Sequence, residues 1–405
     1  MEFGFTDEQE KLRKEVRNFY INELPSDFEL GVLAVSEELQ SFFKALRQKV
    51  GARNWIAASW PQKYGGLGLT AIEEGICAEE QYHQGVSLPN FHAVGLLGPS
   101  MLLLGTEEQR ERLIPPILRG EGYECFELLT EPDAGTDQAN IQLRAVEDGD
   151  NFILNGQKMF VGDAYKPEVL FTLARTADTI PKHRGLTLFI IPADTPGISY
   201  RPLKAMGGQC KNKVFFDDVR VPRENMLGEV GRGFYTNLMV RAERASMLTG
   251  NAARDRRSIE DFIQLCREVR RNGKPLIEDP EVRTSLAQMV VENEVWRLTG
   301  WYATWHFTQR ERLGPYRQEL SGFRWKIWAT KHADTMMGIL GNYGQLKKNS
   351  KWARLAGQVE RLWESARSMH GGGTPERVKV TVAERGLGLP SSRIRPPAAK
   401  IEEKR

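Results

Sequence analysis

Cysteine is scarce in this chain of 405 residues, and its few thiols lie far apart in the sequence. No two of them form a CxxC pair; the four are Cys77, Cys125, Cys210 and Cys266. Isolated thiols of this kind are typical of reduced, cytoplasmic proteins rather than of disulfide scaffolds. The six histidines form no HExxH sequence and no cluster with cysteine, so we expect no metal site.

An excess of charge of one sign is also absent. Lysine and arginine number 56 against 53 aspartates and glutamates, so neither nucleic acid nor an anionic membrane is an expected partner. No apolar run approaches the about 20 residues of a transmembrane helix, and the first residues are too polar for a signal peptide. With 40% hydrophobic and 27% charged residues, the composition is that of a globular protein of two or three domains.

Helical patterns dominate residues 1–122. Two Thr-x-x-Gln sequences, beginning at Thr6 and Thr106, have the spacing of a capping box at the start of a helix. Residues 36–50 carry apolar side chains at helical spacing, which predicts a further helix. The pair Pro115-Pro116 should kink or shorten the helix that follows Thr106.

The pattern changes over residues 123–234 to short segments rich in β-forming residues. Asp148-Gly149-Asp150 has the composition of a hairpin tip. No crossover helices fit between the segments, so we expect a small β-barrel or sandwich rather than parallel βαβ units. The expected strands cover residues 141–146, 152–154, 169–173, 186–191 and 214–216.

Helical spacing returns over residues 235–405. Asp279-Pro280-Glu281 combines an N-cap residue, a proline at the first helical position and an acidic first turn, so it predicts the start of a helix. The chain is therefore expected to be an α+β multidomain protein with helical, β and helical domains in that order. Within the last domain we expect helices over 323–340 and 352–369, and loops over 272–279 and 310–321.

The most specific sequence lies in residues 129–162, LTEPDAGTDQANIQLRAVEDGDNFILNGQKMFVG. Other motifs accompany it along the chain: WPQKYGG at 60–66, GTEEQ at 105–109, TEPDAGTD at 130–137, FDDVRVP at 216–222, GGT at 372–374 and LGLP at 387–390. In this order, they resemble the acyl-CoA dehydrogenase family nearly from end to end.

The resemblance implies a fold, a reaction and partners. The fold is an N-terminal α-helical domain, a middle β-barrel or sandwich and a C-terminal four-helix bundle. The reaction is FAD-dependent desaturation of an acyl-CoA between Cα and Cβ, in which a carboxylate removes the α-proton and a hydride passes to flavin N5. Electrons then go to an electron-transfer flavoprotein, and the enzyme assembles as a homodimer or homotetramer.

The catalytic base is assigned through the same resemblance. Many family members carry a glutamate one residue before the closing Gly-Thr, where this chain has Gly372. Others carry the base in a Glu-Arg pair on the first long helix of the C-terminal domain, which here matches Glu243 and Arg244. Glu243 is thus the expected base and Arg244 a neighbour of the substrate; the alternative is a solvated helical ion pair. Gly372 would offer its N–H to the thioester oxygen, or form only a flexible loop.

The resemblance also implies flavin contacts from two parts of the chain. In the middle domain they are Leu128, Thr130, Gly135, Thr136, Phe160, Val161 and Gly162; in the C-terminal domain they are Arg271, Gly341, Thr374 and Glu376. Thr136 and His92 are further expected to approach the substrate. The alternatives are ordinary ones: turn capping for the threonines, a solvated loop for Arg271, a helix C-cap for Gly341 and a structural role for His92.

Two departures from the family pattern keep other functions open. Gly162 stands where the family usually has a hydroxyl side chain near N5, so an acyl-CoA oxidase that uses oxygen is one alternative. The family's R-x-x-F-G motif is replaced around Arg270–Lys274, so a subunit of a heteromeric acyl-CoA dehydrogenase is another. The length of the acyl chain is not readable from the sequence.

Overall fold

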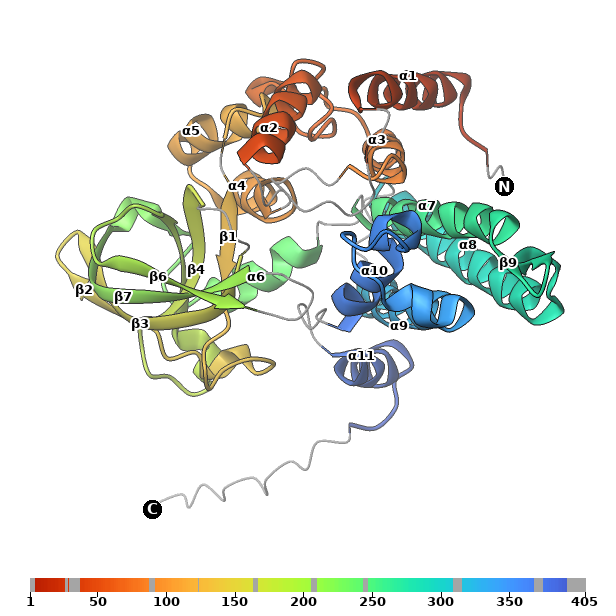
Figure 1. The fold of residues 1–405 in the computed structure, drawn as a ribbon. Helices are drawn as coiled ribbons and strands as arrows, with labels where there is room; N and C mark the ends of the chain where they lie inside the picture. Colours follow the sequence, from red (N-terminus) through yellow and green to blue (C-terminus); the bar gives the residue numbers. More distant parts are fainter. Residues whose placement is uncertain are drawn as a thin grey trace.

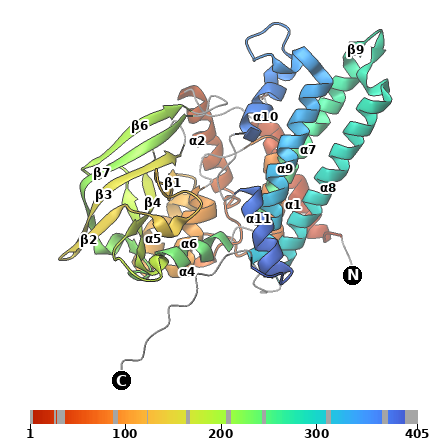
Figure 2. The same ribbon diagram turned by 90° about the horizontal axis from the view of Figure 1, so that it is seen from below.

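A block of helices, a sheet and a second block of helices follow one another along the chain, as the sequence predicts (Figure 1). Figure 2 shows the sheet on one side and the C-terminal bundle on the other. The computed structural model describes residues 4–25, 28, 37–86, 92–122, 124–162, 167–204, 210–242, 247–308, 315–367 and 374–391.

Five helices make up most of the N-terminal part. Both expected capping boxes are present: the side chains of Thr6 and Thr106 accept from the backbone of the third helical residue, whose side chain bonds back. The last of these helices continues through Pro115-Pro116, which lie in its final turn and do not end it. The helices are α1 (Asp7–Glu23), α2 (Glu37–Gly51), α3 (Ala71–His83), α4 (Gly98–Leu104) and α5 (Glu107–Leu118).

The middle part is a mixed sheet of eight strands in the order β6-β7-β3-β2-β4-β5-β8, with β1 paired to β4. Among the described residues it is not a closed barrel, because β6 and β8 are its two ends. The expected hairpin tip is confirmed, since Asp148 pairs with Asn151 across Gly149. The strands are β1 (Cys125–Leu128), β2 (Arg144–Asp148), β3 (Asn151–Val161), β4 (Val169–Arg175), β5 (Leu186–Pro192), β6 (Ile198–Lys204), β7 (Cys210–Pro222) and β8 (Met226–Leu227).

Three long helices and a shorter one pack together as the described part of the C-terminal bundle (Figure 2). Asp279 caps α8 as expected: its carboxylate accepts from the backbone N–H of Glu281 at 2.9 Å. No helix in the described part of the chain combines the length and hydropathy needed to cross a bilayer. The bundle helices are α7 (Met247–Glu268), α8 (Pro280–Thr308), α9 (Pro315–Leu340) and α10 (Gln358–Arg367); α6 (Gly233–Ala242) precedes them and α11 (Pro375–Thr381) follows.

Three expectations for this region need correction. The loop expected over 310–321 is helical from Pro315, because proline is well suited to the first turn of a helix. The loop expected over 272–279 contains a small hairpin of β9 (Arg270–Arg271) and β10 (Lys274–Pro275). The helix expected over 352–369 begins only at Gln358, because the two residues before Gly357 have positive φ values that no α-helix accepts.

Candidate functional site

The turn of residues 129–137 leads from β1 towards β2 and lies against the end of β3. Glu131 and Ala134 bond to each other across the turn, N–H to carbonyl, at 3.0 and 3.2 Å. The Met159 N–H donates to the Thr130 carbonyl at 2.9 Å. The structure therefore brings the TEPDAGTD motif and the Phe160 segment together, although they lie more than 20 residues apart in the sequence.

A buried ion pair supports this turn from inside. Lys158 is completely buried, and its Nζ donates to Glu131 Oε1 at 2.8 Å and to the Leu129 carbonyl at 3.1 Å. Burial lowers the pKa of the Lys158 ammonium to about 8, although the Glu131 carboxylate opposes that shift. Neither residue stands out in the sequence, because a buried lysine looks like any surface lysine in a single sequence.

The middle-domain residues expected at the flavin differ in what they can offer. Leu128 and Val161 are buried in the sheet core, so only their backbone groups are available to a ligand. Thr130 is half-buried, whereas Gly135 and Thr136 are exposed. The turn thus presents small and polar groups at its surface and buries its apolar ones.

Phe160 is the large apolar side chain at this surface. Its ring is 56% exposed, while Lys158 and Val161 on either side are buried. The register between β3 and β7 shifts between these two neighbours, and Phe160 has a φ of +58°. Such an irregularity redirects a side chain out of the regular alternation of a strand. An exposed flat ring beside polar turn residues fits the isoalloxazine ring of a flavin.

Gly162 departs from the family pattern for a steric reason. It has a φ of +55°, and a Cβ placed there would lie 2.2 Å from the ring of Phe126. A threonine or serine therefore does not fit without displacement of Phe126, which is buried in the sheet core. The packing of Phe126 against Gly162 therefore accounts for the absence of a hydroxyl side chain at this position.

A second polar contact joins the turn region to α6. Asn237 Nδ2 donates to Gln138 Oε1 at 3.2 Å, and Asn237 is completely buried. Its Oδ1 has no hydrogen-bond partner among the residues that the structure describes. A buried acceptor normally has a donor, so this atom fits a donor from a bound molecule. Asn237 belongs to no motif that marks it in the sequence.

The C-terminal residues expected at the flavin fall into two separate groups. Arg271 Nη2 donates to the carbonyl of Ile339 at 2.5 Å, which places Arg271 beside the turn at Gly341 (φ +58°). Thr374 caps α11 by accepting from the Arg377 N–H at 3.3 Å, and Glu376 lies in the first turn of that helix. The backbone N–H of Glu376 and the Thr374 hydroxyl lower the pKa of Glu376.

These two groups do not meet within one chain. Figure 2 shows β9 at one end of the bundle and α11 at the other. In both views β9 also lies far from the sheet that carries the turn of residues 129–137 (Figures 1 and 2). Arg271 and Gly341 therefore do not reach the site at Phe160 of their own chain.

The remaining predicted residues are placed only in part. His92 is half-buried at the start of the helical segment that leads into α4. Glu243, Arg244 and Gly372 lie outside the described residues.

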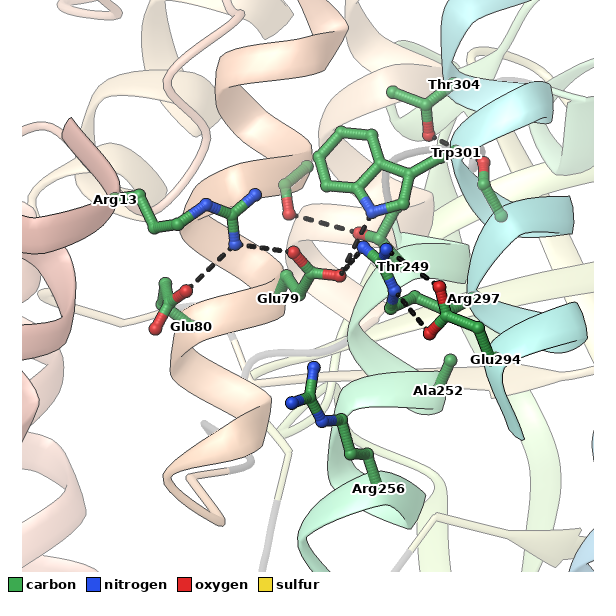
Figure 3. A network of polar contacts seen from close by, with 12 residues as sticks. Arg13, Glu79, Glu80, Thr249, Ala252, Arg256, Glu294, Arg297, Trp301 and Thr304 are labelled. Carbon is green, nitrogen blue, oxygen red and sulfur yellow. Dashed lines mark hydrogen bonds and ion pairs between the residues drawn. The ribbon is translucent and has the colours of Figure 1, made fainter. Parts of the chain in front are cut away.

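A network of polar contacts holds the N-terminal helices to the start of α7 and to α8 (Figure 3). Glu79 on α3 accepts from Arg13 Nη1 at 2.6 Å, from Trp301 Nε1 at 3.0 Å and from Arg297 Nη1 at 3.3 Å. The Thr249 hydroxyl donates to the carbonyl of Gly75 at 3.1 Å. Because Thr249 lies two residues after the start of α7, this network fixes the helix that follows the predicted base.

The helix–sheet–helix order gives the chain three parts, the arrangement of a class of flavin-dependent oxidoreductases whose family models match it. Family models agree: the acyl-CoA dehydrogenase N-terminal, middle and C-terminal domains match residues 6–121, 126–219 and 231–387. The chain belongs to the acyl-CoA dehydrogenase family and is an enzyme of that kind.

Individual relatives match over nearly the whole chain. Acyl-CoA dehydrogenase FadE26 of Mycobacterium tuberculosis is 29% identical, with 96% of this chain and 99% of the relative covered. Probable acyl-CoA dehydrogenase YngJ of Bacillus subtilis is 27% identical, with 96% and 100% covered. Among solved structures, the Tcur3481-Tcur3483 steroid ACAD has a TM-score of 0.86 at 30% identity, with 97% of this chain and 100% of the other covered.

Proposed function

We propose that this enzyme uses FAD to dehydrogenate an acyl-CoA thioester between Cα and Cβ, with Glu243 as the base. The main support is the exposed Phe160 ring beside the turn of residues 129–137, a flat apolar surface next to polar groups. When bound, FAD would accept the β-hydrogen as a hydride and so supply the redox chemistry. The protein contributes position, charge and the acceptor for the α-proton.

The roles of the individual residues follow from their chemistry. Glu243 removes the α-proton, and a location near a bound thioester would raise its pKa towards that of a useful base. The backbone N–H of Gly372 binds the thioester oxygen as negative charge develops there. Thr136, Arg244 and His92 face the substrate. Asn237 Oδ1, for which the described part of the chain offers no donor, supplies a further acceptor.

Flavin contacts on the middle part are assigned to Thr130, Gly135, Thr136 and Phe160, and to the backbone of Leu128, Val161 and Gly162. Thr374 and Glu376 are assigned to the same flavin. Arg271 and Gly341, which lie far from Phe160 of their own chain, contact the flavin of a neighbouring subunit. This division requires at least a dimer, so we propose a homodimer or homotetramer.

An exposed apolar stripe on α8 supports such an assembly. Its members recur every three or four residues, which is the spacing of a helix–helix seam. They are Val291, Val295, Leu298, Tyr302 and Trp305, each between 41% and 57% exposed. We expect Leu298→Glu to shift the protein towards monomer in light scattering. A Glu281→Lys control at the exposed start of the helix should leave the assembly unchanged.

A heteromer is the second candidate. Two structural neighbours are named as pairs of components: the Tcur3481-Tcur3483 steroid ACAD, and the ChsE4-ChsE5 complex from Mycobacterium tuberculosis, which is 28% identical with a TM-score of 0.84. By analogy, this chain would pair with a sister subunit and act on a ring-containing, steroid-derived thioester. Copurification with such a subunit, and absence of flavin without it, would favour this candidate over the homo-oligomer.

The experiment is anaerobic mixing of the FAD-loaded protein with straight-chain, branched and steroid-derived acyl-CoAs. Loss of the visible flavin absorbance with one class identifies the substrate class. Re-oxidation by an electron-transfer flavoprotein supports the dehydrogenase, whereas rapid oxygen consumption without an acceptor protein supports the oxidase alternative. A flavin that no thioester reduces would contradict the proposal.

A further inference from the structure

We propose that Lys158 is a positioning residue for the flavin. With Glu131 it holds the turn of residues 129–137 in register with the end of β3, so that Thr130 and Phe160 present one surface to the cofactor. The inference rests on the proposed flavin site and adds to it a residue pair that lies beneath that site and does not touch the substrate.

The contacts of Lys158 join two consecutive residues of β3 to the start of the turn. Lys158 Nζ reaches the Leu129 carbonyl at 3.1 Å and the Glu131 carboxylate at 2.8 Å. The next residue, Met159, donates its N–H to the Thr130 carbonyl at 2.9 Å. Three successive turn residues are thus held from one side, and the middle one is the expected flavin ligand Thr130.

Glu131 extends the support to the segment that follows the turn and enters β2. Its Oε2 accepts from the Gln142 N–H at 2.6 Å, and its Oε1 accepts from the Leu143 N–H at 2.9 Å. Both donors lie on the segment that enters β2. A buried carboxylate is tolerated only when such donors and a cation compensate its lost hydration. Glu131 has both, so the start of the turn is joined to β3, through Lys158, and to the segment that enters β2.

The position of Lys158 connects this support to Phe160. Lys158 and Val161 are buried, and the strand irregularity between them leaves Phe160 outside with its positive φ. The buried ammonium therefore anchors the inner side of the segment whose outer side carries the exposed ring. Without these contacts of Lys158, the turn and the Phe160 ring are no longer held in a fixed position relative to each other. The surface proposed to bind the flavin is then no longer pre-organised.

The test compares Lys158→Met, which keeps the length of the side chain and removes the ammonium, with the wild type. The dissociation constant of FAD is measured by titrating the apoprotein with FAD and following the quenching of fluorescence. The visible circular dichroism of the bound flavin reports its surroundings. We expect Lys158→Met to raise the FAD dissociation constant at least about tenfold and to change the dichroism. Glu131→Gln should change the dissociation constant and the dichroism in the same directions, but by less. This variant replaces Lys158→Met in the test if Lys158→Met does not fold.

Two matched controls separate positioning from general loss of stability. Lys182→Met removes an exposed lysine that contacts the neighbouring Asn140 at 2.9 Å, and it should leave FAD affinity unchanged. Phe152→Leu destabilises the core of the same strand, beside Phe189, away from the turn. It should lower the thermal midpoint of the apoprotein without weakening FAD binding.

The inference is overturned if the Lys158 and Glu131 variants that fold bind FAD with the wild-type constant. It is also overturned if Phe152→Leu has the same thermal midpoint as the Lys158 and Glu131 variants and weakens FAD binding as much as those variants do. These outcomes differ from failure of the proposed function, in which the wild type itself would bind no FAD or would not react with any thioester.

Discussion

Two buried groups of charges serve different purposes in this molecule. In the middle sheet, Lys158 and Glu131 form one pair with side chains 0% and 6% exposed, within a single part of the fold. Between α1, α3 and α8, Glu79 is shared by Arg13 and Arg297, whose side chains are 12% and 23% exposed (Figure 3). The first group shapes one turn, whereas the second joins helices from opposite ends of the chain.

The difference lies in how completely each group is satisfied. Both oxygens of Glu131 accept backbone N–H groups in addition to the lysine, which fixes the turn in one arrangement. In the cluster around Glu79, the buried Arg13 Nη2 has no hydrogen-bond partner within the described ranges of the chain. An ion pair whose hydrogen-bonding groups all have partners holds one defined geometry. A cluster in which one carboxylate is shared and one donor lacks a partner mainly stabilises the packing between helices. We therefore expect the first to govern cofactor binding and the second to govern stability.

The largest expected effect on stability is that of Glu79→Ala. It leaves Arg13 and Arg297 without their shared carboxylate at a largely buried junction, so the free energy of unfolding should fall by about 3 kcal/mol. Denaturant unfolding measures the change, with Glu294→Gln, at a more exposed partner of Arg297, as the control. The protein that remains folded should bind FAD normally. If Glu79→Ala instead weakened FAD binding and left the unfolding free energy unchanged, the Glu79 cluster would govern cofactor binding rather than stability.

Gly162→Ser tests how rigid the flavin side is. It introduces the hydroxyl typical of the family, but its Cβ would meet the Phe126 ring at 2.2 Å on a backbone of positive φ. We expect a loss of about 2 kcal/mol in unfolding free energy. Gly135→Ser, where an added Cβ would meet no atom of the described, non-adjacent residues within 4 Å, should cost less than about 0.5 kcal/mol. Equal stabilities for the two variants would show that Phe126 moves freely.

A third buried group, in the bundle, predicts a pH dependence. His332 Nδ1 lies 3.0 Å from Asp255 and its Nε2 lies 3.1 Å from Glu292. Burial lowers the pKa of His332, but the two carboxylates outweigh it and leave that pKa above its ordinary value. Its contribution to stability is therefore full below about pH 6.5 and is lost as the pH rises through the raised pKa. Denaturant unfolding between pH 6 and 9 should show this fall, and His332→Gln should flatten it.

Lys158 should show a pH dependence of opposite sign. Its pKa in the folded protein is about 8, against 10.5 for an ordinary lysine. Between these values the unfolded chain binds more protons than the folded one, so this group's contribution to the unfolding free energy rises with pH. The difference in unfolding free energy between wild type and Lys158→Met measures it. A difference that does not change from pH 8 to 10.5 would mean that the pair keeps its proton throughout.

Local signals were sufficient to predict much of the fold. The capping boxes at Thr6 and Thr106, the hairpin at Gly149 and the start of α8 at Asp279 each depend on a few adjacent residues, and each is present. The open ends of the sheet and the β9–β10 hairpin depend on distant pairing, which one sequence does not reveal.

The site was predictable only where a motif marks it. The motif at 130–137 pointed to the turn beside Phe160, and the structure shows why Gly162 carries no hydroxyl. Lys158 and Asn237 gave no signal, because their significance comes from complete burial and from partners more than 25 residues away. Glu243 and Gly372 remain predictions.

The central claim, that Glu243 removes the α-proton, is tested most directly by stopped-flow reduction of bound FAD. Wild type and Glu243→Gln, at equal FAD occupancy, are mixed anaerobically with the thioester that reduces the wild type fastest; Glu268→Gln on the exposed end of α7 is the control. We predict that Glu243→Gln still binds the thioester but reduces the flavin at least about 100-fold more slowly. Reduction by Glu243→Gln at the wild-type rate would contradict the account.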